Sequence, residues 1–191
     1  MPDQQLVSRQ EIAALTTRIE VLEAEAEIRR IQARYMFLCD TPMPEYGVAD
    51  DAERIDLIMA LYAEDATWEG VGEYYTNQFG KLEGAAAIRA HFQKFWGDKQ
   101  DPALVLNCHY LTSEQIHVTG DTAEGQWVHM QPWLYSDGTG LLRSSRLNNA
   151  FARQADGAWK ITRTRTENVF VAPLPNGFAS DYPKASVLMK P

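Results

Sequence analysis

The sequence predicts a single α+β domain in which helices pack against a curved antiparallel sheet. Helical periodicity dominates the first half of the chain, and from Leu104 onward apolar and polar residues alternate with the period of two that is typical of strands. Turn-forming residues separate the strands at 119–121, 137–140 and 156–157. Helices followed by hairpin-linked strands are typical of this class, and 191 residues suit one hydrophobic core.

The longest predicted helix covers residues 9–38 and ends before Pro42, because proline cannot continue a helix. Its first half carries the seam of a short coiled coil, formed by Ile12, Leu15, Ile19, Leu22 and Ala26. Its second half carries a different apolar stripe, formed by Ile28, Ile31, Tyr35 and Leu38. We therefore expect residues 1–26 to form an arm that packs on a partner subunit or along the domain, and the protein to be a dimer or trimer.

The remaining elements follow in order along the chain. Helices are predicted at 52–61 and 84–96, and residues 62–69 change from a helical to a strand pattern. Strands are predicted near 104–118, 123–135, 141–153 and 158–171. The main domain is expected to cover 27–169, and residues 170–191 to form an apolar tail.

Composition and missing motifs narrow the function. A net charge of −8 argues against nucleic acid as a partner, and no apolar run is long enough to span a membrane. The N-terminus lacks the pattern of a signal peptide, so the expected location is the cytoplasm. The two cysteines, Cys39 and Cys108, have no metal-ligand spacing, and glycine-rich nucleotide motifs are missing. We expect no metal and no cofactor.

Several segments, in order along residues 27–165, resemble the SnoaL-like branch of the nuclear transport factor 2 superfamily. These segments are Glu27–Asp40, Leu61–Glu69, Gly84–Arg89, His109–Leu111, Gly120–Trp127, Phe151–Arg153 and Asp156–Ile161. The resemblance implies a cone-shaped fold in which a strongly curved antiparallel sheet wraps around helices and leaves an apolar pocket. The superfamily includes scytalone dehydratase, bile-acid 7α-dehydratase, hexachlorocyclohexane dehydrochlorinase and relatives of ketosteroid isomerase. It also includes binding modules and non-catalytic subunits, so the fold alone does not decide the function.

Three residues are the candidates for catalysis. Asp40 ends its helix, where the macrodipole disfavours a carboxylate, so helix stability does not explain it. Without a family resemblance, Asp40 also fits a surface residue, His109 a hydrogen-bonded core histidine and Tyr35 a core tyrosine. The resemblance implies a catalytic aspartate at Asp40, a base at His109 and a tyrosine at Tyr35 that donates to a substrate oxygen. We expect a carboxylate oxygen of Asp40 within hydrogen-bond reach of one ring nitrogen of His109, and the other nitrogen to face an apolar cavity.

Strand alternation selects the candidate substrate contacts. Trp127 and His129 share one face of their strand, Asn149 points to the same side from the next strand, and Arg143 faces inward near that strand's start. Trp68 and Tyr75 are expected at the pocket mouth, with Tyr74 beside them. A structural histidine at 129 and a simple aromatic core at Trp68 are the alternatives.

Three further residues or segments have expected positions. His91 and His117 are expected on the surface. The tail residues 170–188 are expected to cover the pocket mouth or a neighbouring subunit.

The predicted function is a cofactor-independent lyase that acts by general acid–base chemistry on a bulky aromatic or polycyclic hydroxylated small molecule. Loss of water would make it a dehydratase, and cleavage of a C–C bond would make it a retro-aldol lyase. The alternatives are an isomerase of the same fold and a non-catalytic subunit like the small subunit of ring-hydroxylating dioxygenases.

Overall fold

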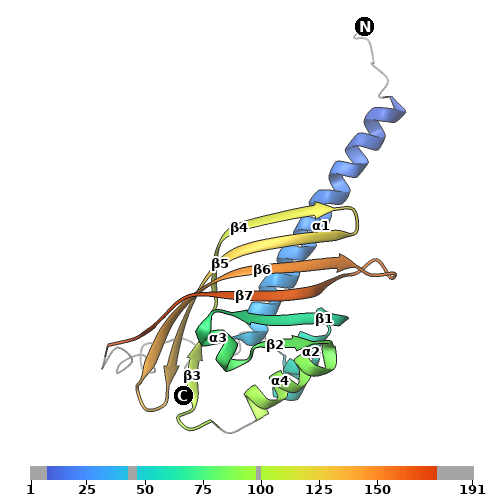
Figure 1. Cartoon of the computed structure of the whole chain (residues 1–191). Coiled ribbons are helices and arrows are strands. Elements are labelled where there is room, and N and C mark those ends of the chain that lie inside the picture. Colours follow the sequence, from blue (N-terminus) through green and yellow to red (C-terminus); the bar gives the residue numbers. More distant parts are fainter. Residues whose placement is uncertain (1–7, 43–46, 98–99, 176–191) are drawn as a thin grey trace.

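The structure is a computed structural model that describes residues 8–42, 47–97 and 100–175. Its helices are α1 (Arg9–Cys39), α2 (Asp51–Met59), α3 (Glu73–Gln78) and α4 (Ala85–Gly97). Its strands are β1 (Tyr62–Val71), β2 (Lys81–Glu83), β3 (Leu104–Asn107), β4 (Tyr110–Thr119), β5 (Thr122–Tyr135), β6 (Gly140–Arg153) and β7 (Trp159–Pro173). The predicted helices and strands are present in the predicted order, and α3 and β2 are additional elements (Figure 1).

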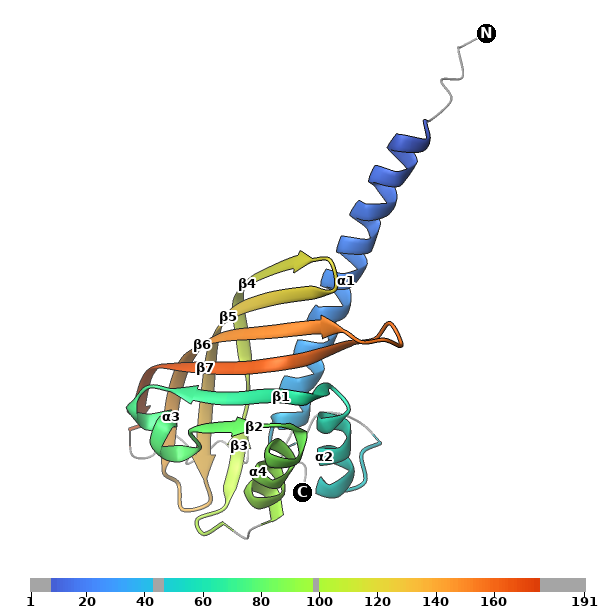
Figure 2. The ribbon, with the colours of Figure 1, turned by 45° about the vertical axis from the view of Figure 1, so that its right-hand side comes forward.

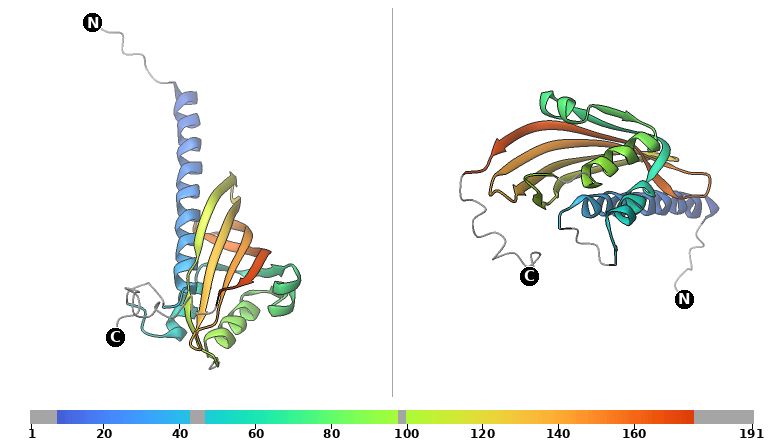
Figure 3. Two further views of the ribbon diagram at one scale, coloured as in Figure 1. Left: turned by 90° about the vertical axis from the view of Figure 1, so that its left-hand side faces the viewer. Right: turned by 90° about the horizontal axis from the view of Figure 1, so that it is seen from below.

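All of these strands join one curved sheet in the order β2-β1-β7-β6-β5-β3, with β4 also paired to β5. The sheet curls into a half-barrel around the helices, so the predicted α+β cone is confirmed (Figure 3). The expectation of a purely antiparallel sheet is wrong at one place, because β1 pairs parallel to β7. Strand alternation predicts which face a residue occupies, but it carries no information about the direction of a partner strand.

The predicted strand at 104–118 is two strands with a gap at Cys108 and His109. β3 pairs with the end of β5 at 133–135, and β4 pairs with its first part at 122–130 (Figure 1). The chain therefore leaves the sheet for two residues at the level of His109. This gap frees the His109 ring from the strict alternation of a continuous strand.

Helix α1 begins with a capping box, in which Glu11 N–H donates to Ser8 Oγ and Ser8 N–H donates to Glu11 Oε2. Its second half packs inside the curved sheet with the predicted stripe of Ile28, Ile31, Tyr35 and Leu38 buried. Its first half extends beyond the sheet (Figures 1 and 2), and its apolar residues Ile12, Leu15, Ile19 and Leu22 are exposed. The role of this arm at a partner subunit stays a prediction. Neither α1 nor any other helix within the described ranges is apolar and long enough to cross a membrane.

Helices α1, α2 and α4 lie on the same side of the sheet (Figure 3), and α2 and α4 lie under β1 and β2 (Figure 2). The core between these layers contains Ile28, Ile58, Ile88 and Ile161, each with no exposed surface. Burial of such side chains stabilises a fold by roughly 1.5–3 kcal/mol each. This packing holds the end of α1 at a fixed position against the sheet.

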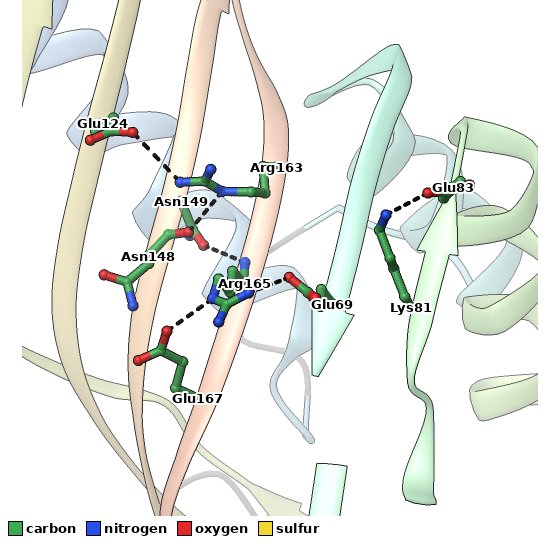
Figure 4. Close-up of polar contacts among 9 residues, drawn as sticks. All are labelled: Glu69, Lys81, Glu83, Glu124, Asn148, Asn149, Arg163, Arg165 and Glu167. Atoms are coloured by element: carbon green, nitrogen blue, oxygen red, sulfur yellow. Dashed lines mark hydrogen bonds and ion pairs between the residues drawn. The ribbon is translucent and has the colours of Figure 1, made fainter. Parts of the chain in front are cut away.

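The outer face of the sheet carries ion pairs (Figure 4). Arg165 on β7 donates to Glu69 on β1 over 2.7 Å and to Glu167 over 2.9 Å. These side chains are about one third exposed, so the pairs add little free energy and mainly keep this face polar. The chemistry of the site lies on the opposite, inner face.

The segment predicted as a tail begins inside the sheet. Residues 170–173 belong to β7 and pair with β6, and Leu174 N–H donates to the carbonyl oxygen of Gly140 over 2.9 Å. Phe178 and Tyr182, like the rest of the segment beyond 175, lie outside the described residues. Covering of the pocket by the tail stays a prediction.

Candidate active site

Asp40 and His109 form a hydrogen-bonded pair. Asp40 Oδ1 lies 2.5 Å from His109 Nδ1, and the same oxygen accepts from the backbone N–H of His109 over 3.0 Å. Both side chains are nearly buried. These two donors offset the unfavourable position of a carboxylate beyond a helix C-terminus. The predicted contact between the carboxylate and the imidazole is confirmed.

A short bridge between α1 and β3 brings the pair together. Thr41 and Asn107 exchange two backbone hydrogen bonds of 2.8 and 2.9 Å, and Asn107 Nδ2 donates to the carbonyl oxygen of Cys39 over 2.9 Å. Asp40 and His109 lie within two residues of this bridge. The end of the helix is therefore joined to the gap between β3 and β4, and the two side chains must meet.

The proton of His109 is located by a chain of side-chain hydrogen bonds. Trp133 Nε1 can only donate, and it points at Asn107 Oδ1 over 2.9 Å, so that atom is the amide oxygen. Gln131 Nε2 also points at Asn107 Oδ1, over 2.5 Å, so it is the donor of the glutamine amide. Gln131 Nε2 lies 3.0 Å from His109 Nε2, which must therefore accept. The ring proton is then on Nδ1, facing Asp40.

His109 lines the cavity, but its Nε2 atom lies against the side-chain amide of Gln131, which corrects the expectation that this nitrogen faces an apolar cavity. The lone pair of Nε2 accepts a hydrogen bond from the amide of Gln131. A substrate must displace that amide before Nε2 can accept a proton from it. Asp40 and Gln131 together hold His109 in one tautomer, with Nε2 as the basic nitrogen. Gln131 also places a hydrogen-bond donor beside that nitrogen.

His109 lines a cavity of about 380 Å³ inside the curved sheet, and Asp40 lies behind it. This volume lies toward the small end of the usual range for ligand pockets, about 300–1,000 Å³. Aromatic side chains dominate its wall: Tyr35, Trp68, Tyr75, Phe79, His91, Phe92, Phe95, Trp96 and Trp133. Its polar side chains include Gln78, Asn107, His109, His129, Gln131 and Arg143. Such a wall suits a flat aromatic ligand held by a few polar contacts.

Tyr35 lines this cavity from α1, as predicted for a substrate contact. Its ring packs edge-on against Tyr62 and Phe92. Burial raises the pKa of the Tyr35 hydroxyl well above its usual value. The hydroxyl therefore keeps its proton and is suited to donate a hydrogen bond.

His129 and Arg143 lie next to each other on the inner face of β5 and β6. Gln131 is the register partner of Arg143, and His129 lies two residues from Gln131, at the next position on the same face of β5. The His129 ring stacks on His109 with ring centres 5.0 Å apart. Burial, the His109 ring and the charge of Arg143 lower the pKa of His129 to about 3. His129 is thus neutral at physiological pH.

Trp68 and Tyr75 line the cavity as predicted. Trp68 stacks on Phe79, with ring centres 4.3 Å apart, and packs against His91. The Tyr75 hydroxyl shares a 2.8 Å hydrogen bond with Ser145. These residues shape the wall, and Trp68 belongs to the aromatic core as well.

Trp127 and Asn149 do not reach the cavity, so the structure corrects their predicted role as substrate contacts. Trp127 donates through Nε1 to Glu114 over 3.1 Å. Asn149 donates to Gln32 Oε1 over 2.8 Å and accepts from the backbone N–H of Arg165 over 3.2 Å (Figure 4). Both point inward, as alternation predicts, but α1 fills that half of the inner face.

His91 is the clearest residue that sequence reasoning placed wrongly. The structure places it in the cavity wall, half-buried and stacked near Trp68, where burial lowers its pKa to about 4. Asn107 and Gln131 belong to the site, although the sequence does not single them out. An amide side chain carries little information in the sequence, because its function here depends on hydrogen bonds to residues of other segments. His117 is exposed, as predicted.

The cysteines behave as small apolar residues. Burial raises the pKa of Cys39, and burial together with the nearby Asp40 raises that of Cys108, so both thiols stay protonated. Within residues 8–42, 47–97 and 100–175, no three His, Cys, Asp or Glu side chains gather in a group that could hold a metal ion.

Comparison with known proteins agrees with this architecture. The profile of the SnoaL-like domain matches residues 20–165, and no curated protein matches the chain in sequence. A protein provisionally named an aromatic ring hydroxylase, from Novosphingobium aromaticivorans, is 21% identical, with a TM-score of 0.62 over 80% of this chain and 94% of its own. A hexachlorocyclohexane dehydrochlorinase from Novosphingobium barchaimii is 17% identical, with a TM-score of 0.60 over 82% and 94%. A protein provisionally named a scytalone dehydratase, also from N. aromaticivorans, is 16% identical, with a TM-score of 0.60 over 83% and 92%.

Proposed function

This chain belongs to the SnoaL-like domain family, and from that premise we propose that it is a cofactor-independent lyase for a hydroxylated aromatic small molecule. The observation that carries the proposal is the 2.5 Å contact between Asp40 Oδ1 and His109 Nδ1 at the wall of an aromatic cavity. Structural neighbours that include a dehydrochlorinase support an elimination reaction. The cavity volume favours a ligand of one or two rings over a larger polycyclic molecule.

His109 is the general base of the proposed reaction. Its Nε2 atom has a free lone pair once a substrate displaces the amide of Gln131. It takes a proton from a carbon next to the carbon that carries the hydroxyl group. The C–H electrons form a C=C bond, the C–O bond breaks, and His109 returns the proton to the departing hydroxide as water. A base of this kind contributes about 10²–10⁴-fold to the rate.

Asp40 has a positioning and electrostatic role. Its carboxylate holds the Nδ1 proton of His109 and faces the positive charge that the ring gains after it accepts a second proton. The additional hydrogen bond from the backbone N–H of His109 keeps Oδ1 in place. Asp40 itself therefore transfers no proton. Its negative charge stabilises the protonated His109 ring that forms when the substrate loses its proton.

Negative charge that develops on a substrate oxygen would meet three donors in the cavity. Tyr35 is a neutral hydroxyl, His129 is a neutral imidazole with one N–H, and Arg143 is a cation. Donors that are already buried and fixed cost little reorganisation during the reaction. A retro-aldol cleavage of a β-hydroxy carbonyl compound would use the same residues. His109 takes the hydroxyl proton, the O–H electrons form a new C=O bond, and the electrons of the broken C–C bond pass through the α-carbon to the carbonyl oxygen, which becomes an enolate oxygen.

A first test uses 3-hydroxy-1-tetralone, an aromatic β-hydroxy ketone whose dehydration yields fluorescent 1-naphthol. We expect turnover by the native chain, and a loss of about 10²–10⁴-fold in the variant His109→Gln. In D₂O, proton NMR should detect deuterium at the carbon next to the carbonyl, even if water loss is slow. Circular dichroism checks that the variant is folded. Equal exchange by the native chain and the variant would contradict the assignment of the base.

A non-catalytic ligand-binding module is the second candidate. One observation favours it: Gln131 already satisfies His109 Nε2, so the imidazole belongs to a hydrogen-bond network that the chain completes by itself. In that case aromatic ligands would bind to the native chain without proton exchange or turnover, and His109→Gln would change affinity alone. Calorimetry together with the exchange measurement separates the two functions.

A further inference from the structure

Arg143 is a buried cation without an anionic partner among the residues that the structure describes. Its side chain lines the cavity and is 3% exposed. Its Nε and Nη1 atoms are buried and have no hydrogen-bond partner within the described residues. Its Nη2 atom has one long contact, 3.5 Å to Gln78 Oε1. No carboxylate of the described residues lies within 4.0 Å of the guanidinium.

Aromatic rings surround Arg143 in place of a carboxylate. The guanidinium carbon lies 4.1 Å from the ring centre of Trp133, 4.9 Å from that of Tyr75 and 5.2 Å from that of Tyr74. Such contacts attract a cation, but they accept none of its in-plane N–H groups. A buried charge with unused donors is costly, so this arrangement is typical of a site that awaits an anion.

His129 adds a second unused donor at the same place. It is 3% exposed, and neither of its ring nitrogens has a hydrogen-bond partner within the part of the chain that the structure describes. It lines the same cavity, next to Arg143 on the neighbouring strand and stacked on His109. Two buried polar side chains, each with donors that have no acceptor among the described residues, therefore face one cavity.

We infer that Arg143 and His129 form a carboxylate-binding subsite, and that the ligand of this cavity is a one- or two-ring aromatic molecule carrying a single carboxylate. A planar carboxylate matches the fork of a guanidinium, and a neutral imidazole supplies one further N–H. One cation and one neutral donor suit a monoanion better than a phosphate dianion. The aromatic wall formed by residues such as Trp68 and Trp133 suits the ring of the same ligand.

The position of this subsite fixes the orientation of the substrate, a step that rests on the proposed function. With a carboxylate on Arg143 and His129, the Tyr35 hydroxyl is the donor left for charge that develops at the reacting oxygen. The His109 ring stacks on His129, so a carboxylate held by Arg143 and His129 places the rest of the molecule near His109 Nε2. Anion binding itself needs no catalysis. It is therefore testable separately from the lyase reaction.

The experiment is calorimetric titration of the full chain with 2-naphthoate and with its neutral isostere 2-naphthamide. We expect 2-naphthoate to bind at least ten-fold more tightly, and Arg143→Gln to remove this preference. Arg143→Lys should keep part of it, because it keeps the charge without the planar fork. The matched control is Arg146→Gln, since Arg146 is exposed on the other face of β6 and should leave both affinities unchanged.

Further measurements distinguish a carboxylate subsite from a loss of catalysis, from general aromatic binding and from binding of other anions. His109→Gln should still prefer 2-naphthoate, so a loss of turnover in that variant does not affect the subsite. Thermal melting should show that 2-naphthoate stabilises the native chain but not Arg143→Gln. Equal affinities for 2-naphthoate and 2-naphthamide would overturn the subsite. Binding of inorganic phosphate or 2-naphthalenesulfonate as tightly as 2-naphthoate would overturn the assignment to a carboxylate.

Discussion

The indole N–H of Trp133 donates to the side-chain oxygen of Asn107 over 2.9 Å, and this bond determines which atom of Gln131 faces His109. Gln131→Glu replaces the amide donor with a carboxylate that would accept a proton from His109 Nε2. We expect this variant to lose about 10²–10⁴-fold in rate, the usual worth of a general base, because the ring would be held in its protonated form. Nitrogen NMR of His109 should detect the change in protonation.

The matched variant Gln131→Met removes the donor without adding an acceptor. We expect it to keep the Nδ1 proton on His109, because Asp40 Oδ1 still faces that nitrogen. Its rate should fall by less than about ten-fold, since the lone pair of Nε2 stays available. Equal losses in Gln131→Met and Gln131→Glu would contradict the expectation that an acceptor at position 131 disables the base and that loss of the amide donor does not.

Asp40→Asn tests the charge of the carboxylate while keeping its shape. We expect kcat to fall nearly as far as in His109→Gln, by about 10²-fold or more, because an amide does not stabilise the protonated ring. The variant should fold, since an amide oxygen can still accept from the backbone N–H of His109. His117→Gln, at an exposed position on β4, is the control and should have native kinetics. Native kcat in Asp40→Asn would refute the pair.

Stability should fall with decreasing pH because of His129. Its pKa is lowered from 6.5 to about 3 in the folded chain, so between these values the unfolded chain binds a proton that the folded chain does not. The free energy of unfolding therefore falls as pH decreases through 6.5, by about 3–5 kcal/mol for this group in full. His91, with a pKa of about 4, acts in the same direction.

The variant His129→Gln should remove the part of this pH dependence that comes from His129 and leave the part that comes from His91. Urea denaturation at several pH values between 7 and 4 measures the slope for the native chain and for the variant. His117→Gln should keep the native slope, because that residue is exposed in the folded chain. An unchanged slope in His129→Gln would mean that His129 is already protonated in the folded state.

Asn149 should matter for stability and not for substrate binding. It is fully buried and joins α1 to β7 through Gln32 and the backbone of Arg165. Asn149→Ala leaves both partners without their bond, so we expect a loss of about 1–3 kcal/mol in the free energy of unfolding. KM should stay within about two-fold of the native value, because Asn149 lies outside the cavity. A large rise in KM would restore it as a substrate contact.

The exposed seam of α1 predicts self-association. Ile19 and Leu22 are 54% and 61% exposed, on a part of the helix that extends beyond the sheet. We expect a dimer or trimer in light scattering, and the double variant Ile19→Glu with Leu22→Glu to shift it toward monomer. Glu20→Gln, at an exposed neighbouring position, is the control. A native monomer at micromolar concentration would contradict the prediction.

The sequence by itself determined the elements and their faces. The period of two in the second half places His129, Gln131 and Arg143 on the inner face of the sheet, and the structure agrees. The apolar stripe of α1 likewise predicts which side of the helix is buried. These properties are local, since each depends only on the spacing of residues within one element. Together with the family resemblance, they were enough to pair Asp40 with His109.

Only the tertiary structure decided which inner-face residues meet the cavity. Trp127 and His129 are two residues apart on the same face, yet Trp127 packs away from the cavity and His129 lines it. The difference arises because α1 fills one half of the curved sheet and leaves the other half open. The roles of Gln131 and Arg143 have the same origin: hydrogen bonds and missing counter-charges depend on partners from distant segments, and no pattern within one strand encodes them.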